Sequence, residues 1–210
     1  MKPELVSFDL DGTLVEIEGV LDKFWYEKIP KLYSERHGIG FEEARKKVKK
    51  AYDDLGMNDM RWYMPSYWFR KFDLKKSPEE VLSGLKGNAK VYEDALQVLD
   101  KLHKKYDIVL VSNAPREIIE VELDGMEKYF KGVYSCPSDF NSLKIDKCYD
   151  RICRELRVEP GKVLHIGDSK RFDYEEPRKA GLNSVFLDRK GTETNVRKVK
   201  DLKEFLGMLD

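Results

Sequence analysis

Four short apolar runs recur along the chain at wide spacing, and each ends at polar residues. They comprise Leu5–Leu10, Ile108–Ser112, Val163–Ile166 and Ser184–Leu187. Each run is rich in Val, Ile, Leu or Phe over nearly its whole length, which is typical of parallel strands covered on both faces. The pattern therefore predicts a buried sheet assembled from distant parts of the chain.

Segments with helical spacing separate these runs. Apolar residues fall on one side in 93–106 and in 147–156, and the segment 175–182 reaches a helix-stopping glycine at Gly181. Strands that alternate with helices form βαβ units. We therefore expect an α/β fold, with a doubly wound, Rossmann-like parallel sheet.

Residues 16–87 interrupt this alternation, because they contain no convincing strand. Helical patterns instead cover 20–38, 41–56, 60–72 and 77–87, with glycines or Ser77-Pro78 at their ends. The sequence thus predicts an α/β core at 1–15 and 88–210 and a small all-helical cap domain at 16–87. An insertion after the first strand is expected near the carboxyl ends of the strands, where open α/β sheets bind ligands.

Composition narrows the function classes. Lys and Arg total 39, Asp and Glu also total 39, and the net charge is zero, so nothing indicates a nucleic-acid partner. We find no apolar run long enough for a membrane span and no signal-peptide pattern, and we expect a cytoplasmic protein, monomeric or dimeric. The three cysteines include no Cys-x-x-Cys pair, and we expect reduced thiols that fill apolar space.

Two aspartates stand at the end of the first apolar run, in the sequence "VSFDLDGTL". Side chains at i and i+2 of a strand face the same way, so Asp9 and Asp11 can reach one site, and Gly12 permits a sharp turn. Two carboxylates this close repel each other unless a cation lies between them or they take part in chemistry. Taken alone, Asp-Gly also suits a surface hairpin turn.

Further polar residues follow later strands. Ser112 and Asn113 end the second run and can donate hydrogen bonds to phosphate oxygens, although an ordinary turn or helix cap has the same residues. Asp168 and Asp173 follow the third run and suggest Mg²⁺, which prefers oxygen ligands, although Asp168 could instead cap a helix. Lys144 precedes a predicted helix and can neutralise an anionic nucleophile and a phosphate.

In order and spacing these residues resemble the haloacid dehalogenase (HAD) superfamily, in its phosphatase branch. The resemblance is carried by "DLDGT" at 9–13, "VSN" at 111–113, Lys144, and "GDSKRFD" at 167–173. It covers roughly 1–15 and 88–210, and the helical insertion matches the family's cap in position and helical character only. Ile145 follows Lys144 where many relatives have proline, which leaves Lys147 as a rival for the lysine.

The resemblance implies a Mg²⁺-dependent phosphomonoester hydrolase that acts on a small-molecule phosphoester. Asp9 would be the nucleophile that forms an aspartyl-phosphate, and Asp11 the general acid and base. Mg²⁺ would be held by the Asp9 carboxylate, by Asp168 and by the main-chain carbonyl of Asp11. Asp173 would lie behind these ligands and help to orient them. The phosphoryl oxygens would be held by Ser112, the Asn113 backbone N–H and Lys144.

Other functions remain open from the sequence. A phosphomutase of the same superfamily would keep Asp11, whereas a 2-haloacid dehalogenase works without metal and lacks that aspartate. A non-catalytic binding protein would need none of the acids, and no G-x-G-x-x-G follows the first strand to support a nucleotide cofactor. The aromatic block at 61–72 could line a substrate lid, but we expect it to form the core of the cap.

Overall fold

The computed structural model describes residues 2–123 and 125–209. The chain divides into two compact units, here called the core unit and the helical unit. The core unit comprises Met1–Glu16, Val91–Asn113 and Gly125–Asp210, and the helical unit comprises Ile17–Lys90 and Ala114–Asp124. The helical unit thus includes a segment after Asn113 that the sequence analysis had placed in the core domain.

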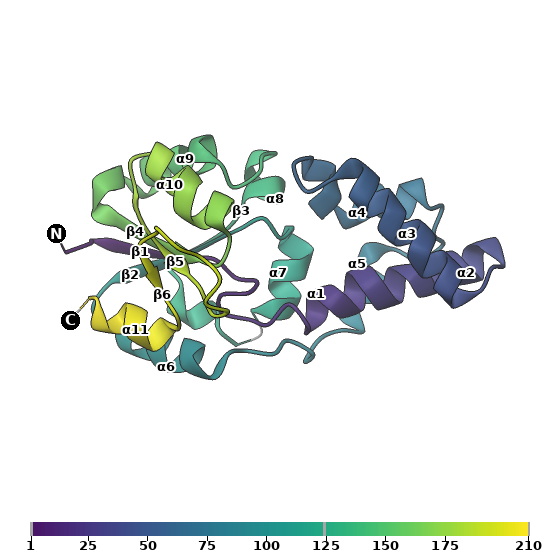
Figure 1. Ribbon diagram of the computed structural model, residues 1–210, viewed down its shortest axis with the longest axis horizontal. Helices are drawn as coiled ribbons and strands as arrows, with labels where there is room; N and C mark the ends of the chain where they lie inside the picture. The colour runs from purple at the N-terminus through teal and green to yellow at the C-terminus, as the bar shows by residue number, and fades with distance from the viewer. Residues whose placement is uncertain (1, 124, 210) are drawn as a thin grey trace. The chain divides into compact units, whose positions relative to one another are not determined.

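The core unit is built on a parallel sheet that has six strands in the described part of the chain, in the order β3-β2-β1-β4-β5-β6 (Figure 1). Every neighbouring pair runs parallel. The strands are β1 (Leu5–Phe8), β2 (Asp107–Ser112), β3 (Gly132–Ser135), β4 (Val163–Gly167), β5 (Asn183–Leu187) and β6 (Lys198–Val199). The prediction of a doubly wound, Rossmann-like α/β fold is confirmed.

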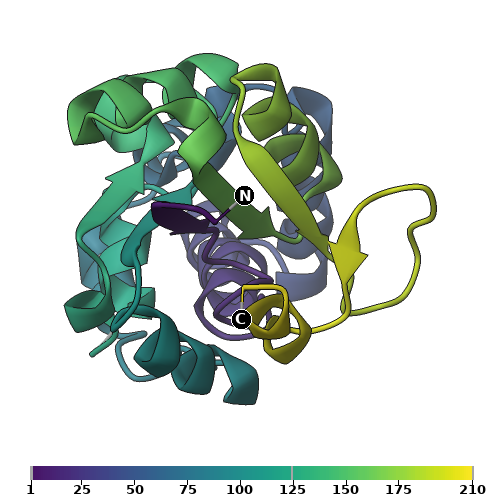
Figure 2. The same cartoon turned by 90° about the vertical axis from the view of Figure 1, so that its left-hand side faces the viewer.

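Helices cover both faces of this sheet (Figure 2). Alternating residues of β1 separate the two faces, because successive side chains of a strand point in opposite directions. Leu5 packs in a buried cluster with Tyr149 and Ile152 of one covering helix, whereas the Phe8 ring meets that of Phe205 on the other face, with centroids 5.8 Å apart. The helices of the core unit are α6 (Glu93–Leu102), α8 (Cys136–Phe140), α9 (Asp146–Leu156), α10 (Glu176–Lys179) and α11 (Leu202–Gly207), with the short turns η3 (Glu127–Tyr129) and η4 (Pro160–Lys162) and the π-helical η5 (Lys170–Glu175).

The helical unit contains no strand between residues 17 and 90, all of which the structure describes. Its long first helix ends at Gly38, whose φ of 62° suits glycine, and Ser77 and Glu80 form a reciprocal capping box. Its elements are α1 (Val20–Asp22), the π-helical η1 (Lys23–Lys28), α2 (Ile29–His37), α3 (Phe41–Leu55), η2 (Met60–Tyr63), α4 (Pro65–Lys71), α5 (Pro78–Ser83) and α7 (Arg116–Glu122).

Aromatic side chains form the interior of the helical unit. Trp68 is fully buried, and its ring meets that of Tyr52 edge-on at a centroid distance of 4.6 Å and that of Phe72 at 5.4 Å. Arg61, at the edge of the aromatic block, pairs with Asp59. The block at 61–72 thus packs as apolar core, as expected from the sequence. Across residues 2–123 and 125–209, no helix joins enough length with enough apolar character for a bilayer crossing.

A disulfide joins Cys136 at the start of α8 to Cys148 in the first turn of α9. The expectation of three reduced thiols is therefore wrong for these two, while Cys153 is a buried free thiol. A spacing of 12 residues carries no disulfide motif, and only the turn between the two helices brings the sulfurs together. The bridge closes a loop that contains Lys144.

Reduction of this disulfide should lower the free energy of unfolding by about 3 kcal/mol, because a cross-link that closes a loop of this length restricts the unfolded chain by about that much. Urea unfolding of the protein with and without dithiothreitol measures the difference. The double variant Cys136→Ser/Cys148→Ser should not respond to the reductant, whereas Cys153→Ser should respond like wild type. Three titratable thiols in the denatured, non-reduced protein would contradict the bridge.

Candidate active site

The carboxyl ends of β1 and β4 bring the first two acids together. Asp9 follows β1, Asp168 follows β4, and the strands are neighbours with Phe8 paired to Ile166. The Asp9 N–H donates to the Ile166 carbonyl at 3.0 Å, which extends the ladder by one residue. Because both strands end at the same edge, the carboxylates are side by side by construction of the sheet.

The turn after β1 depends on a glycine. Gly12 has φ of 73°, and a Cβ at this position would overlap the Asp168 carboxylate. Its N–H donates to the Val15 carbonyl at 2.8 Å, which closes the turn behind Asp11. Asp11 is half-buried, and its charge acts on both Asp9 and Asp168. Asp9, Asp11 and Asp168 line one edge of the sheet in the core unit, here called the acid-lined edge. The Asp-Gly pair is part of this edge and does not form a hairpin turn.

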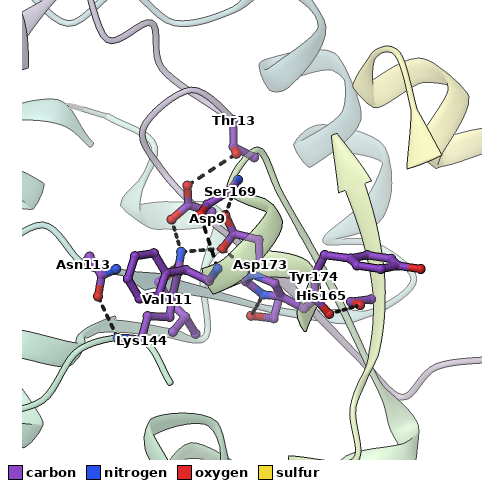
Figure 3. Close-up of polar contacts among 12 residues, drawn as sticks. Asp9, Thr13, Val111, Asn113, Lys144, His165, Ser169, Asp173 and Tyr174 are labelled. Carbon is purple, nitrogen blue, oxygen red and sulfur yellow. Dashed lines mark hydrogen bonds and ion pairs between the residues drawn. The ribbon is translucent and has the colours of Figure 1, made fainter. Parts of the chain in front are cut away.

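Lys144 lies between two of the carboxylates (Figure 3). Its ammonium pairs with Asp9, with Asp173 at 2.6 Å, and with the Val111 carbonyl at 3.2 Å. The side chain is 2% exposed, although it carries a charge. Lys147, the rival from the sequence, is an exposed residue of α9. The geometry thus selects Lys144 as the cation of this cluster.

Ser112 is the last residue of β2 and Asn113 follows it, and β2 neighbours β1 on the side opposite β4. Both are buried, and the Asn113 side-chain oxygen accepts a 2.7 Å hydrogen bond from the Lys144 N–H. The structure therefore gives Asn113 a role that the sequence analysis did not foresee, since its side chain holds the backbone of the lysine. All four predicted segments converge at one edge of the sheet.

Asp173 is fully buried in η5 and takes hydrogen bonds on both oxygens. The Ser169 N–H donates to Oδ2 at 2.8 Å, and the ring nitrogen Nε2 of His165 lies 2.9 Å from Oδ1. One oxygen from each of Asp9, Asp168 and Asp173 falls within 4.8 Å of the others. Gly167 makes this approach possible, because a Cβ there would lie 2.7 Å from the Asp9 Cβ.

The burial and crowding of these acids shift their pKa values. Burial raises the pKa of the Asp9 carboxyl well above its ordinary value, and the Asp173 charge adds to this while Lys144 opposes it. Burial and then the Asp173 charge raise the pKa of Asp168 to about 7. Burial also disfavours charge on Lys144, but Asp173 and Asp9 outweigh it and raise the lysine's pKa. Lys144 is thus a permanent cation among acids.

The polar residues behind Asp173 were missed as part of the site. The sequence analysis assigned no role to His165, which is fully buried and contacts Ser7, Tyr149 and Asp173. One signal was available, since His165 lies at an even spacing from Gly167 and shares its face of the sheet. The contact with Tyr149 of α9 could not be read from the sequence.

A family model described as haloacid dehalogenase-like hydrolase matches residues 3–181. The chain belongs to the haloacid dehalogenase-like hydrolases. A HAD phosphatase from Thermococcus onnurineus has a similar structure, with a TM-score of 0.87 and 26% identity over 100% of this chain and 98% of that one. The predicted family is confirmed, and the family model and the phosphatase relatives support a hydrolase of phosphatase type.

Two further relatives are phosphatases by name. The N-acylneuraminate-9-phosphatases of Rattus norvegicus and Homo sapiens are 24% and 25% identical to this chain, over 89% of it and 83% of each relative. A 2-haloacid dehalogenase from Pseudomonas syringae has a TM-score of 0.69 at 15% identity, which shows a shared fold alone.

The residues of this HAD hydrolase fit a hard divalent cation. Asp9, Asp168 and Asp173 supply carboxylate oxygens close to one another, the ligands that Mg²⁺ prefers. Asp11 adds a nearby negative charge, and Lys144 supplies one opposing charge. One ammonium cannot balance these four acidic residues, so a bound cation would reduce the mutual repulsion that adds to burial in raising the pKa values of Asp9 and Asp168.

Replacing Lys144 by Met should lower the free energy of unfolding by about 3–5 kcal/mol, because Asp9 and Asp173 then remain buried without their counter-charge. Lys147→Met is the matched control, three residues along and exposed, and should change stability by less than about 0.5 kcal/mol. Urea unfolding of both variants in metal-free buffer measures the difference. Equal effects of the two substitutions would show that the ion pairs of Lys144 do not stabilise the core unit.

Proposed function

We propose that this protein is a Mg²⁺-dependent phosphomonoester hydrolase that works through an aspartyl-phosphate on Asp9. The observation that carries the proposal is the pairing of a buried Asp9 carboxylate with the buried Lys144 ammonium, beside Asp168 at the same strand edge. A carboxylate held against a cation and next to further acids is suited to attack phosphorus, and the phosphatase relatives support the same chemistry.

Asp9 and Asp11 divide the chemistry between them. A carboxylate oxygen of Asp9 attacks phosphorus, the bond to the ester oxygen breaks, and the alcohol leaves with the proton of the Asp11 carboxyl. The Asp11 carboxylate then removes a proton from water, whose oxygen attacks the same phosphorus. The bond to Asp9 breaks, inorganic phosphate leaves, and both aspartates return to their starting states.

The remaining residues orient the phosphoryl group and its charge. Lys144, the Ser112 hydroxyl and the Asn113 N–H would donate to phosphoryl oxygens, while the Asn113 side chain keeps the backbone of Lys144 in place. Asp9, Asp168 and the Asp11 carbonyl would hold Mg²⁺, with Asp173 in support. When bound, this cation would withdraw charge from the phosphoryl oxygens and offset the carboxylates.

The substrate proposed is a small phosphorylated metabolite, and the helical unit is the part of the chain proposed to select it. We also propose a core domain at 1–15 and 88–210 and a cap domain at 16–87. The proposed location is the cytoplasm, and the proposed state is a monomer or a dimer. Because two relatives are named for N-acylneuraminate 9-phosphate, that compound belongs in the first panel of sugar phosphates, polyol phosphates and nucleotides.

Hydrolysis of an aryl phosphate with Mg²⁺ tests the proposal. We expect Asp9→Asn to abolish turnover and Asp11→Asn to lower kcat by about 10²–10⁴-fold, the usual contribution of a general acid and base. Asp100→Asn, an exposed residue of α6 that pairs with Lys104, is the control and should keep wild-type rates. Acid quenching during turnover should trap phosphate on the wild-type protein and none on Asp9→Asn.

Three outcomes would overturn this function. An Asp9→Asn variant that keeps the wild-type rate would show that Asp9 is not the nucleophile. Transfer of phosphate to a second sugar without release of inorganic phosphate would indicate a mutase. Turnover absent across the panel, together with no Mg²⁺-dependent binding of fluoroberyllate, would favour a binding protein.

A further inference from the structure

We propose that His165 is a positioning residue that fixes the Asp173 carboxylate and, through it, the ammonium of Lys144. Its activity readout rests on the proposed phosphatase function, whereas its binding and spectroscopic readouts do not. His165 is fully buried in β4, and its ring nitrogens contact Ser7, Tyr149 and Asp173. It therefore acts through the residues that it touches.

Three polar side chains surround the imidazole. Its Nδ1 lies 2.8 Å from the Ser7 hydroxyl, and its Nε2 lies 2.9 Å from Asp173 Oδ1 and 3.1 Å from the Tyr149 hydroxyl. Ser7 and His165 are partners in the register of β1 and β4. The imidazole is thus anchored by β1 and β4, the two strands after which Asp9 and Asp168 come.

The hydrogen bonds determine which nitrogen carries the proton. The Tyr149 hydroxyl lies 2.7 Å from the Phe172 carbonyl, which can only accept, so the tyrosine proton points there. The Asp173 carboxylate accepts as well, so Nε2 of His165 must donate. In the neutral ring, which carries a single proton, Nδ1 is then an acceptor, and the Ser7 hydroxyl donates to it. This single neutral tautomer satisfies both ring nitrogens and both hydroxyl protons.

The same contacts hold the Asp173 carboxylate from two sides. Oδ1 receives the His165 Nε2–H and the Lys144 ammonium, and Oδ2 receives the Ser169 N–H. With every contact satisfied, the carboxylate has one favoured rotamer. The Asp173 charge is also the largest attraction on Lys144 and the largest repulsion on Asp9 after burial. A displaced Asp173 would therefore shift the ammonium that has to meet Asp9.

Packing alone does not explain a histidine at this position. A buried polar ring costs free energy unless its nitrogens are hydrogen-bonded, and Val163, two residues earlier on the same face of β4, shows that an aliphatic side chain can pack on this face beside Tyr149. Partners that orient a metal-site carboxylate typically change metal affinity or activity by about 10–100-fold when they are removed. A positioning role predicts a loss of this size.

Three substitutions separate the hydrogen bond from the packing. The amide nitrogen of His165→Gln can reach the place of Nε2 and donate to Asp173, whereas that of His165→Asn reaches only the place of Nδ1, and His165→Leu fills the space without a donor. His103→Gln, at the partly exposed end of α6, is the matched control.

Magnesium affinity measured by titration calorimetry is the first readout. We expect His165→Gln and His103→Gln to stay within about 3-fold of wild type, and His165→Asn and His165→Leu to lose about 10–100-fold in Mg²⁺ affinity or in kcat at unchanged KM. Variants are compared well below their melting temperatures, so that unfolding does not enter the result.

Nitrogen NMR is the second readout, and it needs neither metal nor substrate. With three histidines in the chain, the spectrum should show one neutral ring protonated on Nε2 and assigned to His165 by its loss in the variants. The Lys144 ammonium signal should move in His165→Asn and His165→Leu and stay in His165→Gln.

The proposal is overturned if His165→Leu is folded and retains the Mg²⁺ affinity, the kcat and the Lys144 signal of wild type. It is also overturned if His165 is protonated on Nδ1, or if His165→Gln loses as much as His165→Leu. Failure of the phosphatase function would appear as absent hydrolysis in wild type, while the Lys144 and His165 signals would still decide the positioning role.

Discussion

The ammonium of Lys144, shared by Asp9 and Asp173, is the interaction on which the acid-lined edge depends. Buried carboxylates repel each other and resist leaving water, and a single buried cation between two of them offsets both effects. Removal of the cation would leave charges whose burial costs more than the fold gains from them. Everything around Lys144 keeps it in place, from the Asn113 side chain on its backbone to the disulfide that closes its loop.

The parallel sheet explains how residues so far apart in sequence meet. Strands β2, β1 and β4 are consecutive in the sheet, so the residues after each strand emerge at one edge. This strand order alone places Asn113, Asp9 and Asp168 close together. Lys144 reaches them from the segment before α9. The lysine and η5 then complete the cluster from the side of the sheet that α9 covers.

The sequence predicted the parts that depend on strand ends and missed those that depend on packing between elements. Asp9 lies at the end of the first apolar run and Asp168 comes shortly after the third, so their place at an edge could be inferred. Strand β3 begins at a glycine and β6 has only two residues, and neither gives a periodic signal. Only the packing of α9 on β4 places Tyr149 beside His165, and the same fold brings Cys136 and Cys148 together.

At the acid-lined edge several carboxyl groups lie close together in a buried environment, which is electrostatically unfavourable. The pKa of Asp168 rises to about 7 and that of Asp173 falls to about 2, although both carboxyls are crowded into the same buried site. Burial raises both values, but the charge of Lys144 and the His165 hydrogen bond act most strongly on Asp173 and outweigh it there. Asp173 is thereby held as the charged partner of Lys144 and His165. Asp9, which shares the ammonium, and Asp168 have raised pKa values and stay responsive to a cation or a phosphoryl group. Such a division between supporting and reacting carboxylates needs a rigid base, and the paired residues Ser7 and His165 of two adjacent strands supply it.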